Sequence, residues 1–118
     1  MPAFERPASP PVWSVVRVPF PYTGRPVLQR RPGLVVWAHE GAGRFALAWV
    51  LMITSAENRG WTGDVAISDL DRAGLPAPSI VRTAKIATVE ADHVEPLGTL
   101  AAGDRAAVTT ALAGRLPA

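Results

Sequence analysis

Apolar and polar positions alternate in several short stretches of this chain, a pattern typical of β-strands. In residues 13–20, Val16, Val18 and Phe20 fall on one side and Arg17 on the other, which predicts a strand with one solvated face. We predict that Pro19 and Pro21 end this strand, because proline cannot donate to a strand ladder. The polar, basic residues 21–31 are predicted to form a loop.

The longest apolar run covers residues 45–54 and follows a glycine turn at 41–43. Its composition would also suit a buried helix, but the preceding turn and the Ile53-Thr54 ending favour a central strand covered on both faces. The other predicted strands are shorter and cover residues 32–38, 65–67, 79–83, 85–90 and 94–100.

Helical signals are confined to two places. Residues 69–74 resemble one helical turn closed by a glycine. Near the end of the chain Val108, Leu112 and Leu116 are spaced four apart, and Asp104 suits the positive N-terminal end of a helix. Many short strands and one closing helix predict a mainly β fold, a small curved barrel.

The composition fits a single domain. The chain has 118 residues, with 12 prolines and 10 glycines that indicate many turns. Residues 1–11 are predicted to be a flexible proline-rich tail without the apolar segment of a secretion signal, and residues 12–118 to be the domain. No apolar run is long enough to cross a bilayer, so no membrane is expected and the cytoplasm is the predicted location. With no cysteine, disulfides and thiolate chemistry are excluded.

The charge is small in total but uneven in distribution. A net charge of +2 is too little for a general polyanion binder. Residues 1–39, however, contain five arginines and one acid, and no carboxylate lies between Arg6 and His39. Arginine suits forked recognition of phosphate. A codon preference for arginine explains the total number of these residues better than their clustering.

Several kinds of site find little support in the sequence. His39 and His93 lie far apart and outside metal-binding spacings, so no metal site or cofactor is predicted. The glycines at 41–43 are not followed by the later glycine and the helix of a dinucleotide-binding loop. No serine-nucleophile motif occurs. Phosphate chemistry by arginine and hydroxyl groups remains, as in metal-independent RNA cleavage, where the RNA's own 2′-hydroxyl is the nucleophile.

Three parts of the chain, taken together, resemble the MazF/PemK family of toxin–antitoxin ribonucleases. The first joins residues 15–24 and 31–36, the second is 52–55, and the third joins 63–70 and 78–90. The resemblance implies an SH3-like barrel of the MazF/CcdB type with a C-terminal helix. It also implies a homodimer with single-stranded RNA in a groove across it, and a cognate antitoxin whose tail blocks that groove. The products would be 2′,3′-cyclic phosphate and 5′-hydroxyl ends.

The resemblance also assigns residues. The family's catalytic arginine precedes the proline that opens the second strand, here Arg31, and its catalytic threonine closes the third strand, here Thr54. Each residue also has an alternative, structural role. Arg31 would only clamp the loop, and Thr54 would only satisfy backbone groups at the end of the strand. RNA contacts are expected from residues of the first loop, the third strand end and the later strands: Thr23, Arg25, Arg30, Ser55, Trp61, Arg82 and Lys85.

Some of these assignments keep alternatives. Trp61 would stack on a base or anchor its loop, and Arg82 and Lys85 would touch phosphate or flank the sheet. Trp37 and Trp49 lie in apolar strands and are expected in the core or a dimer interface.

The chain departs from the family pattern at two points. Trp13-Ser14 stands where the first strand usually begins with Gly-Asp, which we expect to alter packing more than chemistry. Ala84 stands where relatives often carry an acid proposed as the general base, so Glu57, Asp64 or water would have to serve. A non-catalytic topoisomerase poison of the same fold, or an RNA-binding module that has lost cleavage, therefore stays an alternative.

Overall fold

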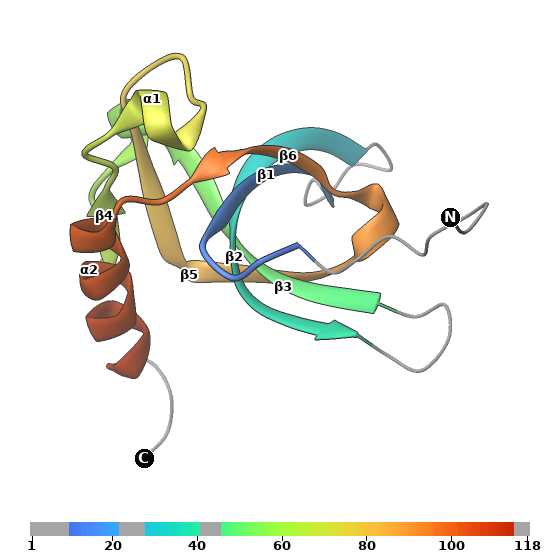
Figure 1. Ribbon diagram of the computed structural model, residues 1–118. Helices are drawn as coiled ribbons and strands as arrows, with labels where there is room; N and C mark the ends of the chain where they lie inside the picture. The colour runs from blue at the N-terminus through green and yellow to red at the C-terminus, as the bar shows by residue number, and fades with distance from the viewer. Residues whose placement is uncertain (1–9, 22–27, 41–45, 115–118) are drawn as a thin grey trace.

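The computed structural model describes residues 10–21, 28–40 and 46–114 (Figure 1). Its six strands, two α-helices and two short 3-10 helices follow one another in the order β1 (Ser14–Pro21), β2 (Leu28–Glu40), β3 (Ala46–Ser55), η1 (Ala56–Asn58), β4 (Asp64–Ala66), α1 (Leu70–Ala73), β5 (Ser79–Glu90), η2 (Ala91–His93), β6 (Glu95–Thr99) and α2 (Ala102–Ala113). The predicted glycine turn at 41–43 and most of the predicted tail, residues 1–9, lie outside the described residues.

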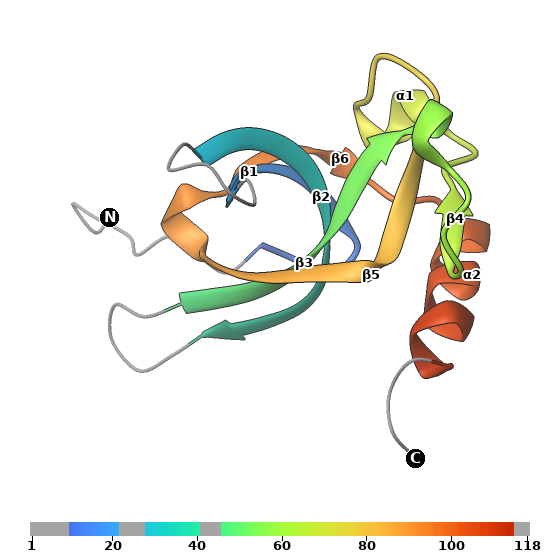
Figure 2. The ribbon, with the colours of Figure 1, turned by 180° about the vertical axis from the view of Figure 1, so that it is seen from behind.

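The strands form one antiparallel, strongly curved sheet in the order β4-β5-β3-β2-β1-β6. The prediction of a mainly β fold with a C-terminal helix is confirmed. The sheet curls around itself but does not close, since β4 and β6 are its two edges (Figures 1 and 2). Pro96 lies in β6, as expected for a proline at a sheet edge.

The prediction that Pro19 ends β1 is wrong, whereas Pro21 is the last residue of the strand. The strand continues through Pro19 to Pro21, paired with β2, whereas its pairing with β6 stops at Arg17. A proline there needs no ladder partner on its open side, so the missing N–H costs little. As a consequence β2 begins at Leu28, and Arg30 and Arg31 lie in a strand rather than in the predicted loop.

The two predicted strands 79–83 and 85–90 form one strand, β5, with a bulge. Leu51 of β3 pairs with Ile86, while the next residue, Met52, pairs with Arg82. Residues 83–85 therefore have no partner in β3. A bulge bends a strand, and β5 turns sharply along its length in Figure 2. The sequence break at Ala84 marks this bend rather than the end of a strand.

Neighbouring residues of one strand point to opposite faces of a sheet, and here both faces carry apolar cores. Val15 belongs to a cluster that includes Ala73 of α1 and Val108 of α2, so this face is covered by the helices. Val16 belongs to a second cluster on the opposite face, with residues of β2 and β3. The predicted solvated face of the first strand is thus limited to Arg17, which is exposed, because Val15 on the same side is fully buried.

Helix α1 is the predicted helical turn, and it packs closely against β6. The Asp69 carboxylate caps it by accepting from the Arg72 N–H at 3.0 Å, and Gly74 ends it in the left-handed conformation with φ of 74°. A Cβ on Gly74 would clash with the Leu97 carbonyl, and a Cβ on Gly98 would clash with backbone oxygens of α1. Both glycines therefore permit the close approach of α1 and β6 that walls the pocket described below.

Helix α2 lies beside β4 and β5 (Figures 1 and 2). Val108 is fully buried, and the Asp104 carboxylate accepts from the Ser68 N–H and hydroxyl at 2.8 and 3.0 Å. Asp104 thus fixes the helix to the β4–α1 connection besides favouring its N-terminus. Within the described residues no helix is both long and apolar enough to span a membrane.

Candidate active site

A pocket of about 310 Å³ opens where β2 and β3 meet the segment that follows α1. Arg31 and Pro32 of β2 and residues 53–55 of β3 form two sides, and residues 74–79 form the third. Arg17 of β1 and Leu97 of β6 complete the wall. The two residues predicted to be catalytic, Arg31 and Thr54, therefore line one pocket.

The strand pairing explains why this space is open. The ladder between β2 and β3 runs as far as the pair Gly33 and Met52, and Arg31 and Thr54 lie two residues beyond it. There β2 pairs with β1 alone, while β3 pairs with β5, where Thr54 faces Ile80. The pocket forms where β2 and β3 no longer pair with each other. Pro32 suits this position, because a proline there interrupts no pair with β3.

Two arginines of neighbouring strands, Arg17 and Arg31, line the pocket, and Arg30 lies next to Arg31 on β2. Arg17 and Arg30 each donate to the same oxygen of Glu95, at 3.5 and 3.4 Å. The side chains of Arg17, Arg30 and Glu95 are each about half exposed. Arg31 is partly buried. Among the described residues that line the pocket, none is acidic and none is histidine. The site is therefore basic and suited to an anion such as phosphate.

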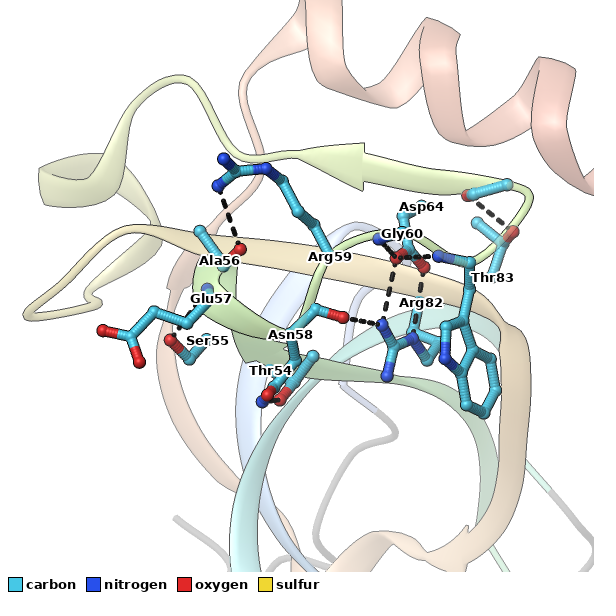
Figure 3. A network of polar contacts seen from close by, with 12 residues as sticks. Thr54, Ser55, Ala56, Glu57, Asn58, Arg59, Gly60, Asp64, Arg82 and Thr83 are labelled. Atoms are coloured by element: carbon cyan, nitrogen blue, oxygen red, sulfur yellow. Dashed lines mark hydrogen bonds and ion pairs between the residues drawn. The ribbon is translucent and has the colours of Figure 1, made fainter.

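The Thr54 hydroxyl has a defined hydrogen bond. Its oxygen accepts from the side-chain amide of Asn58 at 3.0 Å (Figure 3). The next residue, Ser55, accepts from the Glu57 N–H at 3.2 Å and so caps η1. The end of β3 is thereby held to the short helix that follows it.

Arg82 lies beside Asn58, the last residue of η1, at the centre of a buried group of contacts that we call the Arg82–Asp64 clamp (Figure 3). Its guanidinium donates to both oxygens of Asp64 at 3.2 and 3.0 Å and to the Asn58 carbonyl at 2.6 Å. It also lies 4.1 Å from the centroid of the Trp61 ring. Arg82 is only 6% exposed, so its charge is neutralised inside the protein.

Asp64 is strongly engaged and suits a structural role. Besides Arg82, it accepts the N–H groups of Gly60 and Trp61 at 3.1 and 3.0 Å. The hydrogen bonds from Arg82 hold the pKa of Asp64 below its ordinary value, against the opposing effect of burial, and the two backbone donors act with Arg82. A carboxylate with a lowered pKa is a weak base. Of the two acids considered as general base, Asp64 is therefore unsuited, whereas Glu57 is exposed.

The predicted RNA-contacting residues fall into separate places. Ser55 lines the pocket and Arg30 lies beside it, bound to Glu95. Trp61 is 49% exposed although Arg82 lies over its ring, so it anchors its loop and still presents surface. Lys85 and Ala84 are exposed in the β5 bulge. The last two predicted residues, Thr23 and Arg25, lie outside the described residues.

Sequence reasoning missed several residues of this region. Arg17 was assigned only to a solvated strand face, and its place two residues before Pro19 gave no chemical signal. Asn58 carries no chemical signal of its own in the sequence, and only the three-dimensional contact with Thr54 brings it to the site. Glu95 is far from the arginines in sequence, and the pairing of β1 with β6 brings it opposite Arg17. In the described part of the chain, no group of three or more histidine or acidic side chains could hold a metal ion.

Trp37 and Trp49 are not in the core. They pair across β2 and β3 with ring centroids 4.6 Å apart, and they are 38% and 43% exposed. Trp37 also stacks on His39, and Ile86 on β5 is 53% exposed. Of the two predicted locations the core is therefore wrong, and a dimer interface stays a prediction.

Comparison with known proteins places the chain in a family. The model of the PemK-like, MazF-like toxins of type II toxin–antitoxin systems matches residues 12–115. The chain belongs to this family. No curated protein sequence gives a match.

Solved structures share the fold at low sequence identity. The toxin MazF-mt6 of Mycobacterium tuberculosis is 20% identical, with a TM-score of 0.66 over 86% of this chain and 93% of that chain. A mycobacterial endoribonuclease in complex with its cognate antitoxin is 23% identical, with a TM-score of 0.66 over 93% and 99%. MazF of Deinococcus radiodurans is 19% identical, with a TM-score of 0.67 over 92% and 96%.

Proposed function

We propose that this chain is a toxin that cleaves single-stranded RNA in the cytoplasm without a metal ion, and that a cognate antitoxin neutralises it. The observation that carries the proposal is the meeting of Arg31 and Thr54 in one basic pocket. Family membership and the likeness to an endoribonuclease bound to its antitoxin support the same activity.

In the proposed reaction the 2′-oxygen of the RNA attacks the adjacent phosphorus, and the bond from phosphorus to the 5′-oxygen breaks. The products are a 2′,3′-cyclic phosphate and a 5′-hydroxyl. Arg31 donates to the phosphoryl oxygens, on which charge builds up in the transition state, and Thr54 adds one hydroxyl donor. The proton of the 2′-hydroxyl passes to water or to Glu57, and the leaving 5′-oxygen is protonated from solvent.

The RNA backbone would extend from the pocket along neighbouring basic residues. Arg17 and Arg30 are half exposed, and their shared partner Glu95 leaves donors of both guanidinium groups for phosphate. The exposed part of Trp61 offers a surface on which a base can stack. We assign Arg82 to holding this loop, because its Nε and Nη2 donors are bound inside the protein. Lys85 stays a candidate for outer phosphate contacts.

We also propose that the chain forms a homodimer through the exposed apolar surface of Trp37, Trp49 and Ile86. Monomeric proteins seldom expose contiguous aromatic and aliphatic side chains of this size. Aromatic residues are enriched at the centres of protein interfaces. An acidic antitoxin tail would compete with RNA for Arg17 and Arg31 of the pocket and for Arg30 beside it.

The test is incubation of pure protein with long RNA in EDTA, followed by mapping of the new ends. Discrete cuts with 5′-hydroxyl ends are expected. Arg31→Ala should lose at least about 100-fold in rate, the scale of a lost transition-state donor, and Thr54→Val about tenfold or more. Arg72→Ala, an exposed arginine outside the pocket lining, is the control and should cleave normally. Intact RNA at high concentrations of wild-type protein would refute the proposal.

One observation favours a second candidate, a toxin of the same fold that binds without cleaving. The described residues lining the pocket include no acid or histidine to accept the 2′-proton, and Ala84 removes the acid expected nearby. Growth arrest by the wild-type protein without any RNA cleavage would support this candidate.

A further inference from the structure

The direction of the Thr54 hydroxyl is set by a neighbour that the proposed reaction does not use. A threonine hydroxyl has one proton to donate and can accept two hydrogen bonds. Because its oxygen accepts from the Asn58 amide at 3.0 Å, one acceptor position is filled by a donor, and the Thr54 proton is left to point elsewhere (Figure 3). That proton is the one required to reach a phosphoryl oxygen.

Asn58 is itself fixed in place from several sides. Its main-chain carbonyl accepts from Arg82 at 2.6 Å. Arg82 in turn is held by both oxygens of Asp64 and by the Trp61 ring. At the other end of η1, the Ser55 hydroxyl caps the helix. The backbone of Asn58 is therefore anchored to buried groups, while its exposed side chain reaches back to the end of β3. A hydrogen bond between two such anchored groups loses little entropy when it forms.

We propose that Asn58 is a positioning residue for Thr54, and that the Arg82–Asp64 clamp keeps it in register with the pocket. The inference rests on the proposed RNA cleavage, because it concerns the orientation of a group in that reaction. It also gives Arg82 a part in catalysis at a distance, through the loop it holds. Orientation of a donor before the reaction contributes to the rate because no reorganisation is then needed in the transition state.

The test compares Asn58→Leu and Asn58→Asp with wild type in steady-state cleavage of a short RNA oligonucleotide. Leucine removes the donor at similar volume, and kcat should fall about tenfold with less than a threefold change in KM. Aspartate can only accept, so it would draw the Thr54 proton toward itself, and kcat should fall about 100-fold. Thermal melts would establish that both variants are folded, with Asn58→Ala as a substitute if leucine is not.

The decisive control repeats both substitutions in a Thr54→Val background. If Asn58 acts through the hydroxyl, Asn58→Leu should cost no further activity there, and only the charge effect of aspartate should persist. Wild-type kcat for Asn58→Leu, or an equal loss in both backgrounds, would overturn the inference. These outcomes require that wild-type protein cleaves RNA in a manner dependent on Arg31, so a failure of the proposed function is recognised separately by intact RNA with the wild type.

Discussion

The Arg82–Asp64 pair should dominate the response of this fold to a single neutralising substitution. Asp64→Asn keeps the shape of the side chain but leaves the Arg82 charge, 6% exposed, without its counter-charge. Removing one partner of a buried pair costs about 3–5 kcal/mol. We expect about 3 kcal/mol, the lower end, because the Asn58 carbonyl and the Trp61 ring still face the guanidinium. For a domain of this size that is a fall in Tm of roughly 10–15 °C.

The effect should depend on pH in a defined direction. The pKa of Asp64 is lowered in the folded protein, mainly by its hydrogen bonds from Arg82. The stabilisation is therefore fully present above the unfolded pKa of about 4 and is lost as the pH falls through the lower, folded value. The gap between wild type and Asp64→Asn should be constant from pH 7 to about 5 and should narrow below about pH 4.

Urea denaturation followed by circular dichroism would measure this gap, at one protein concentration because dimerisation changes apparent stability. Asp71→Asn is the matched control, an exposed acid on α1, and should change the free energy of unfolding by less than about 0.5 kcal/mol. A gap below about 0.5 kcal/mol at pH 7 would refute the reasoning. So would a gap of the same size at pH 3 and pH 7.

Other predictions concern the helix end, the dimer, the arginines and the rate. Gly74→Ala should lower the free energy of unfolding, measured in urea, by about 2 kcal/mol or more, since φ of Gly74 is 74° and a Cβ there would meet the Leu97 carbonyl. Gly103→Ala is the control and should not lower it, because a Cβ at Gly103 of α2 meets open space. Trp49→Glu should sediment as a monomer where wild type is a dimer, and an unchanged dimer would contradict the proposed interface. Glu95→Gln should tighten RNA binding about two- to fivefold, the scale of exposed ion pairs, and weaker binding would contradict it. With water as the base, log kcat should rise with pH through neutrality, and a plateau above about pH 6 would indicate a carboxylate instead.

The course of the strands was predictable from the sequence because hydrophobic alternation reports local geometry. The predicted strands up to 90 and the helix near Val108 all appear in the structure. The errors occurred where a neighbouring strand was missing. Pro19 looked like a strand end, yet it lies where β6 no longer pairs with β1. The sequence contains no local signal for which edge of a strand is open.

The candidate site was predictable only in part, for a similar reason. Arg31 and Thr54 were named through the resemblance to the MazF/PemK family, and the structure brings both to one pocket. The structural role of Arg82 could not be predicted from the sequence. Its partners Asp64 and Asn58 lie 18 and 24 residues away and meet it only in the folded chain, where β4 pairs with β5. An arginine is charged in the sequence whether it faces RNA or a buried carboxylate, and burial alone separates the two.

The arginines around the candidate site thus differ in their surroundings. Arg82 is neutralised by a carboxylate of its own, whereas Arg17 and Arg30 share Glu95 at the edge of the pocket that Arg17 and Arg31 line. Such a pocket attracts phosphate in a cleaving and in a non-cleaving toxin alike, so RNA affinity does not distinguish the two. Cleavage further requires a donor aimed at the phosphoryl oxygen and an acceptor for the 2′-proton. A general base is worth about 10²–10⁴ in rate, so an enzyme that relies on water for this step should be slow, and its remaining rate should depend all the more on the alignment of the Thr54 hydroxyl.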